Sequence, residues 1–203
     1  MKLRPFAGIT AAALAAGTIW LSLATRAVSD EKLKVDSPAR ETSPALTAFE
    51  RIKALAGDWT SKSTKGWTER ESYQVIAGGS VVMHLSYGAH PGEWMATMFH
   101  MDGDRLMLTH YCIAKNQPRL RATEFSDDGG KVTFTFQDGT NLSSRDQGHM
   151  DKHVMEFEGA DRLRTQWTWY QSGKESWMEE IEHRRAPKSA GQPDHPAAPT
   201  ESQ

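Results

Sequence analysis

The sequence predicts an all-β domain, an antiparallel meander of about ten short strands closed into a barrel, preceded by one short helix. Two observations predict this fold. Short runs rich in apolar, aromatic and β-branched residues alternate with turn signals such as Asp102-Gly103-Asp104 and Asp127-Asp128-Gly129-Gly130. In addition, no segment between these runs has the length and pattern of a helix that could connect parallel strands.

The expected strands share a period of two and end at turn residues. In chain order they are WTSKST, RESYQVI, SVVMHLSY, WMATMFHM, RLMLTHYC, RLRATEFS, KVTFTFQ, HVMEFE, RLRTQWTWYQ and ESWMEEIEH. In 131–137, for example, Val132, Phe134 and Phe136 face one way while lysine and threonine face the other. Closure would remove the two exposed edges of such a meander, so we expect a barrel, with a two-sheet sandwich as the alternative.

The expected helix precedes the first strand. Ser43 is a suitable N-cap, Pro44 fits the first helical position, and Gly57 fits the C-terminal cap. Leu46, Phe49, Ile52 and Ala56 fall on one face at helical spacing. The helix is short, and we therefore expect it to cover part of a larger β-structure.

The N-terminal segment has the pattern of a secretory signal peptide, which we assign to residues 1–27. Lys2 and Arg4 precede an uncharged apolar stretch, residues 6–24, that ends in small residues. A signal peptide implies a periplasmic or secreted protein. The alternative is an uncleaved segment, which would then be the only contact with a membrane.

Composition divides the rest of the chain into three parts and argues against nucleic acid as a partner. Residues 28–43 are polar and aperiodic, as in a linker, residues 44–185 form the expected barrel domain, and the proline-rich residues 186–203 are expected to be disordered. With 24 basic and 26 acidic residues, the chain has no strong field for nucleic acid. The single cysteine cannot form an internal disulfide.

Gly57-Asp58-Trp59, directly after the helix and at the start of the first strand, resembles the Gly-x-Trp signature of lipocalins and their calycin relatives. The resemblance implies that Trp59 closes the barrel floor and that a basic residue after the last strand, Arg184 or Arg185, packs on it. It also implies a calycin-like barrel that binds small apolar molecules rather than catalysing a reaction.

Longer pieces of the chain are similar to uncharacterised bacterial lipocalin-like domains of unknown function. These pieces are AGGS (77–80), MLTHYC (107–112), NQPR (116–119) and WTWYxxGK (167–174). The number of strands is closer to the fatty-acid-binding-protein and nitrobindin branch of calycins. However, Ser61 and Ser63 stand where nitrobindins carry further glycines, so the haem site of nitrobindins is not implied.

His110 and Cys112 lie two residues apart on one expected strand and therefore share a face. Their Cα atoms would be roughly 6.6 Å apart, which is too far for an activated Cys–His pair. Leu106 and Leu108 share that face, so it should point inward. His110 is then either a polar anchor in a cavity or a hydrogen-bonded core histidine, and Cys112 a small buried thiol.

Other candidate contacts lie on later strands and loops. His153 is in register with Met155 and Phe157, and we expect it to point inward, with His149 in a loop. The two histidines would lie roughly 13 Å apart on a strand, which excludes a shared metal ion. Glu179, Glu180 and Glu182 read as a solvated face.

The sequence therefore predicts an exported protein that holds a mostly apolar small molecule. The expected ligand-binding residues are His110, Tyr111, Asn116, Arg119, His153, Trp167 and Trp169. No metal site and no catalytic residue is predicted, and haem is a possible cofactor because an apolar slot with a histidine can hold it. The alternatives are a haem-dependent or acid–base enzyme with a cavity histidine, and a structural or partner-binding envelope protein with a filled barrel.

Overall fold

A computed structural model describes residues 43–87, 90 and 92–187 of the chain. The expected signal peptide, all but the last residue of the expected linker, and most of the expected tail lie outside these residues. Within the described part, no helix has the length and apolar character needed to cross a membrane.

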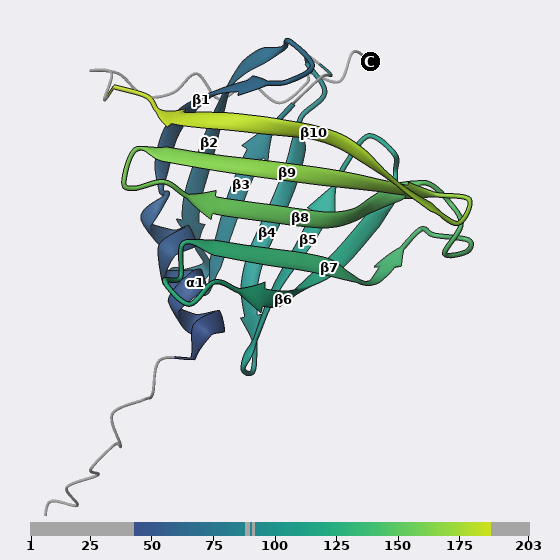
Figure 1. Ribbon diagram of the computed structural model, residues 1–203, viewed down its shortest axis with the longest axis horizontal. Helices are drawn as coiled ribbons and strands as arrows, with labels where there is room; N and C mark the ends of the chain where they lie inside the picture. Colours follow the sequence, from purple (N-terminus) through teal and green to yellow (C-terminus); the bar gives the residue numbers. More distant parts are fainter. Residues whose placement is uncertain (1–42, 88–89, 91, 188–203) are drawn as a thin grey trace, which may run out of the picture. The chain divides into compact units, whose positions relative to one another are not determined.

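Ten antiparallel strands form one closed barrel, in which chain neighbours pair and β1 also pairs with β10 (Figure 1). The strands are β1 (Gly57–Ser63), β2 (Thr68–Ile76), β3 (Val81–Ser86), β4 (Met95–Asp102), β5 (Arg105–Tyr111), β6 (Gln117–Phe125), β7 (Lys131–Thr140), β8 (His149–Phe157), β9 (Arg162–Gln171) and β10 (Lys174–Arg185). This confirms the predicted fold class, and the β1–β10 pairing excludes the two-sheet sandwich. A short 3-10 helix, η1 (Ala77–Gly79), connects β2 and β3.

The helix α1 (Pro44–Ala54) precedes the barrel, as expected. The hydroxyl of Ser43 accepts a hydrogen bond from the backbone N–H of Leu46, at 3.2 Å, and so caps the N-terminus. The expected C-terminal cap at Gly57 is wrong, because the helix already ends with Leu55 as its cap. Gly57 instead starts β1 with a φ of 127°, a conformation that favours glycine.

One end of the barrel is closed by α1 and Trp59. The Trp59 side chain is fully buried, and its indole N–H donates to the carbonyl of Leu55 at 2.7 Å. The guanidinium of Arg185 lies over the Trp59 ring at 4.5 Å and donates to the carbonyls of Ala54 and Ala56. The expectation of a basic residue on this tryptophan is therefore confirmed, with Arg185 in that role.

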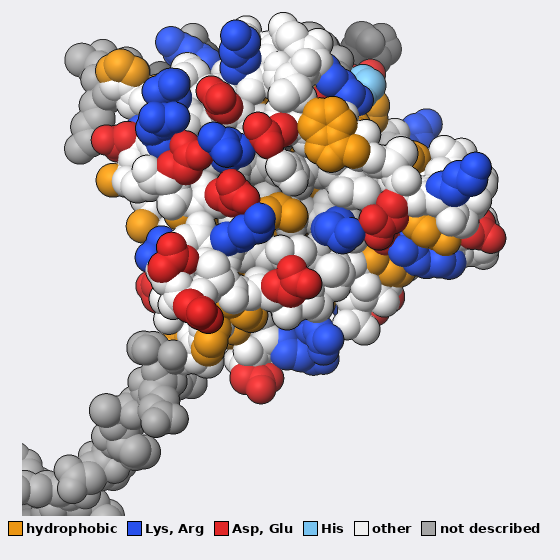
Figure 2. All heavy atoms as spheres, viewed as in Figure 1, with side chains coloured by type: hydrophobic (Ala, Val, Ile, Leu, Met, Phe, Trp, Pro, Cys, Tyr) orange, Lys and Arg blue, Asp and Glu red, His pale blue; other side chains and the backbone are white. Residues whose placement is uncertain are grey.

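Because the strands alternate in direction, every second connection lies at the end near α1. We call the interior next to α1 the floor half, and the interior next to the loops β1–β2, β3–β4, β5–β6, β7–β8 and β9–β10 the mouth half. The floor half is filled by fully buried apolar side chains that include Val82, Phe99, Leu106, Leu108, Leu120, Val132, Phe134, Met155 and Leu163. On the outer face seen in Figure 2, acidic and basic side chains are interspersed.

Candidate ligand-binding cavity

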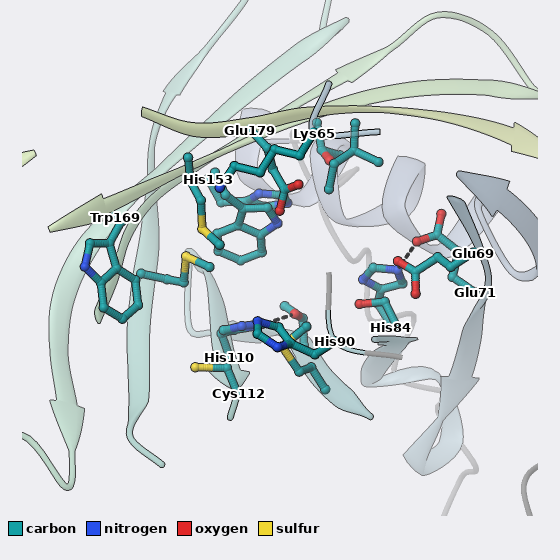
Figure 3. A pocket seen from close by; sticks show the side chains of 18 of the residues that line it. Lys65, Glu69, Glu71, His84, His90, His110, Cys112, His153, Trp169 and Glu179 are labelled. Carbon is teal, nitrogen blue, oxygen red and sulfur yellow. Dashed lines mark hydrogen bonds and ion pairs between the residues drawn. The ribbon is translucent and has the colours of Figure 1, made fainter. Parts of the chain in front are cut away.

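The mouth half of the barrel contains a cavity of about 470 Å³ (Figure 3). Residues of four mouth loops or hairpins line it, among them Lys65, His90, Ile113 and Trp177. The side chains that carry its chemistry are the carboxylates Glu69, Glu71 and Glu179, the imidazoles His84, His110, His153 and His183, and the indoles Trp67, Trp167, Trp169 and Trp177. Its volume is within the range of small-molecule sites.

Glu71 lies at the centre of a buried hydrogen-bond network. Its carboxylate accepts from His84 Nε2 at 2.9 Å and from His183 Nδ1. Burial alone would raise the pKa of the Glu71 carboxyl, but the charge and hydrogen bonds of His183 and His84 outweigh burial and hold that pKa well below its usual value. Glu71 is therefore an ionised, fixed carboxylate in the cavity wall.

The network continues from His183 to Thr165, whose hydroxyl is 2.8 Å from His183 Nε2. A hydroxyl, an imidazole and a carboxylate in series are the parts of a nucleophile activated by a base. However, Thr165 lies within β9 and is paired with both β8 and β10, so backbone N–H groups at this position are engaged in ladders and cannot form an oxyanion hole. The arrangement therefore suits the fixing of polar groups better than acyl transfer.

Glu179 enters the cavity from β10, and its side chain is only 5% exposed. Its Oε2 accepts hydrogen bonds from the hydroxyl of Ser63 at 2.5 Å and from the indole N–H of Trp67 at 2.8 Å. The interpretation of Glu179 as part of a solvated face is therefore wrong, although Glu182 is exposed as expected. Past the bulge between Trp177 and Glu179, the inward positions on β10 are Glu179, Ile181 and His183.

His110 points into the cavity from β5 and is 4% exposed. Its Nδ1 forms a hydrogen bond with the hydroxyl of Thr97 at 2.9 Å, whereas its buried Nε2 has no hydrogen-bond partner within the described residues. Burial, with a smaller contribution from the charge of His84, lowers the pKa of His110 to about 3. At neutral pH the ring is therefore neutral and has one unused nitrogen.

His153 lies on β8, and its ring stacks on Trp167 with centroids 3.8 Å apart. Its Nδ1 donates to the backbone carbonyl of Gln166 at 3.2 Å, which leaves Nε2 as the acceptor of the neutral ring. Burial lowers the pKa of His153 well below its usual value. Because His110 also contacts Trp167, at 4.8 Å between ring centroids, the three side chains form a neutral imidazole–tryptophan wall.

Four of the seven residues expected from sequence line the cavity: His110, His153, Trp167 and Trp169. Cys112 also lines it, on the same face as His110, and burial raises the pKa of its thiol. A raised pKa keeps the sulfur in its less reactive thiol form.

The other three expected residues lie elsewhere. Tyr111 follows His110 on the strand, so it faces outward and is 46% exposed. Asn116 is buried and donates to the carbonyl of Gly148 at 2.9 Å, joining two mouth loops. Arg119 is exposed and forms an ion pair with Asp138 across β6 and β7. The structure therefore does not bring these three side chains to the cavity wall.

His149, expected in a loop, is instead the first residue of β8 and is fully buried. It lies outside the cavity wall, between the rings of Phe136 and Tyr170. The guanidinium of Arg145 forms a hydrogen bond with its Nε2 and covers Tyr170 at 3.7 Å. His149 is therefore a structural residue beneath the β7–β8 loop.

Sequence reasoning missed Glu69, Glu71 and His183. On β2 the alternation of Glu69, Glu71 and Tyr73 is visible in the sequence, and all three side chains are buried. Tyr73 is the only apolar residue of this set, so the period of two was too weakly marked to reveal which face was the inner one.

The described residues contain no group of three or more His, Cys, Asp or Glu that could hold a metal ion. Haem would find two neutral imidazoles in the described wall, His110 and His153, and His110 Nε2 has no hydrogen-bond partner there. The remaining wall does not fit it, because haem carries two propionates. The described wall has three carboxylates and one ammonium, that of Lys65, and its imidazoles His84 and His183 are already bound to Glu71. The cavity therefore does not suit haem.

A scan against models of known protein families gives no match, and no curated protein is significantly similar to the chain. The closed ten-stranded antiparallel barrel is consistent with a calycin-like fold. Any statement on function therefore depends on the cavity itself.

Proposed function

We propose that the protein is an exported binding protein that holds a small organic molecule in the mouth-half cavity. The observation that carries this proposal is His110 Nε2, a buried polar atom that has no partner among residues 43–87, 90 and 92–187, in the wall of a cavity of about 470 Å³. An unmet buried hydrogen-bonding group costs about 1–3 kcal/mol. A ligand that bonds to this nitrogen would recover that free energy.

The wall suggests a ligand with both apolar and polar parts. Trp167 and Trp169 offer flat apolar surfaces, while Glu71 and Glu179 offer fixed acceptors. A flat body with at least one polar group suits this wall better than a purely aliphatic chain. The expected ligand is therefore not only mostly apolar but also flat, with at least one polar group.

Two alternatives receive less support. A barrel filled by its own side chains does not fit a cavity of this volume. Acyl transfer at Thr165 has no backbone oxyanion hole to support it, because the residue lies within the paired part of β9. Export rests on the basic and apolar pattern of residues 1–27.

The proposal is tested with N-phenyl-1-naphthylamine, a neutral aromatic probe whose fluorescence rises in apolar surroundings. We expect saturable binding to the full chain. Ser86→Trp, which fills the cavity from β3, should weaken binding by about tenfold or more. Ser72→Trp, on the outer face of the neighbouring strand β2, is the matched control and should bind normally. Equal binding by the two variants would contradict a site in the cavity.

A further inference from the structure

We propose that the ligand is an organic cation, an amine on an aromatic or other flat body, whose charged group binds beside Glu179. This inference rests on the proposed function and specifies the chemical class of the ligand. It begins from the distribution of charge in the cavity. The carboxylates come from β2 and β10, which both pair with β1, so they form one acidic wall.

Within this acidic wall, Glu71 already has two imidazole partners, His84 and His183. Glu69 accepts a hydrogen bond from the backbone N–H of Tyr87 at 2.6 Å and has further interactions. These two carboxylates are therefore fixed by the protein itself.

Glu179 differs, because the hydrogen bonds it receives come from the neutral groups of Ser63 and Trp67 and both end on Oε2. No ion pair joins Glu179 to a basic side chain in the described part of the chain. The exposed Lys65 lines the same cavity, but its ammonium is not within ion-pair distance of Glu179. A buried carboxylate without a cation is costly, and a ligand ammonium near Oε1 would offset that cost.

Two further observations support a ligand at this place. The indole of Trp67 adjoins the carboxylate, and aromatic faces attract ammonium groups. Elsewhere on the wall, the buried His110 Nε2 has no hydrogen-bond partner within the described residues, so a second polar group of the ligand can bond there. Figure 3 shows Glu179 and His110 reaching the same cavity from different sides.

The neutral state of two other cavity residues, His110 and His153, strengthens the argument. The lowered pKa values of His110 and His153 keep both rings uncharged at neutral pH, so neither repels a cation. An anionic ligand, in contrast, would meet the Glu179 carboxylate, whose charge no ion pair offsets in the described part of the chain, whereas that of Glu71 is offset by His84 and His183. The geometry therefore selects for positive charge on the ligand.

The test compares three probes with one body and different charge: 2-phenylethylamine, 2-phenylethanol and phenylacetate. Isothermal titration of the full chain at pH 7.5 should show the amine binding about tenfold more tightly than the alcohol, with phenylacetate weakest. Glu179→Gln keeps the size of the side chain and removes its charge. In that variant the amine and the alcohol should bind with about equal affinity.

Glu182→Gln, an exposed position on the same strand, is the matched control and should keep the full preference. Binding of N-phenyl-1-naphthylamine by Glu179→Gln reports whether the cavity persists in that variant. Phenylacetate binding as tightly as the amine, or a preference for the amine that survives in Glu179→Gln, would overturn the inference. If the naphthylamine probe binds but none of the three phenyl probes does, the cationic class is wrong and the proposed function stands. If the naphthylamine probe does not bind either, both the cationic ligand class and the proposed function are wrong.

Discussion

The two halves of the barrel interior are built by the same strands but differ in chemistry. On β5, Leu106 and Leu108 fill the floor half, and His110, on the same face, lines the cavity of the mouth half. On β9, Leu163 belongs to the floor and Thr165 to the polar network. The alternation of inward and outward residues is continuous, and only the polarity of the inward residues changes.

This difference shows that the residues that stabilise the fold and the residues that line the cavity lie in different halves of the barrel interior. The floor half buries side chains without polar atoms under α1, which contributes most to folding. The mouth half buries carboxylates and imidazoles, which lowers stability unless each has a partner. Proteins accept such a cost where a ligand is bound.

The largest expected effect is on the floor half. Phe134→Ala removes a fully buried ring that packs edge-on against Phe99 at 5.9 Å between centroids. Urea denaturation should show the free energy of unfolding reduced by about 3–5 kcal/mol. Trp177→Ala, at a mouth residue that is 60% exposed, is the control and should change it by less than about 0.5 kcal/mol. Similar losses of unfolding free energy in both variants would contradict the different roles of the two halves.

The next effect concerns Glu71, whose charge holds the mouth-half network together. Glu71→Gln leaves His183 and His84 facing a neutral amide, and should reduce the free energy of unfolding at pH 7.5 by about 2–3 kcal/mol. The folded-state pKa of Glu71 is depressed, so its contribution is present above the ordinary value of 4.5 and is lost as pH falls below it. Urea titrations at pH 7.5 and at pH 4 or below should show a smaller difference between wild type and variant at the lower pH.

A third prediction concerns His110, whose pKa falls from 6.5 to about 3 on folding. Below pH 6.5 the unfolded chain binds a proton there that the folded chain does not, so stability decreases as pH falls. The contribution of this group between pH 7.5 and pH 5 is about 2 kcal/mol. His110→Leu should therefore lose less stability than wild type over that range, and bind ligand less well. Parallel pH dependence in the two proteins would show that His110 is not buried in its neutral form.

The smallest effect is expected on the outer surface. Lys152 and Glu175 form an exposed ion pair at 3.0 Å between β8 and the start of β10. Lys152→Ala should change the free energy of unfolding by less than about 0.5 kcal/mol, because water and salt screen exposed pairs. Thermal unfolding monitored by circular dichroism would measure it. A larger loss would mean that closure of the barrel at the mouth depends on surface charge.

The floor half could be predicted from the sequence to a large extent. The apolar period of two in β5 and β7 marked the inner face, and Trp59 with a basic residue after the last strand marked the closed end. These signals are strong because an apolar side chain on a strand is informative about burial.

The mouth half could be predicted only in part. His110 and His153 were found because apolar neighbours on the same face fixed their direction. Glu179 and His183 were not, because a polar residue that faces a cavity has the same sequence pattern as one that faces water. Only the closed barrel, which places β10 and β2 on either side of β1, brings these groups to one wall.

The pairing of β1 with β10 has a consequence for the order of folding. Trp59 lies opposite Arg185, so the contact that completes the barrel joins the first and last strands of the domain. Contacts this distant in the chain form slowly, because a long loop must be ordered first. Until β10 is available, β1 and β9 present open edges. A nascent chain that lacks its last strand therefore cannot reach the native topology.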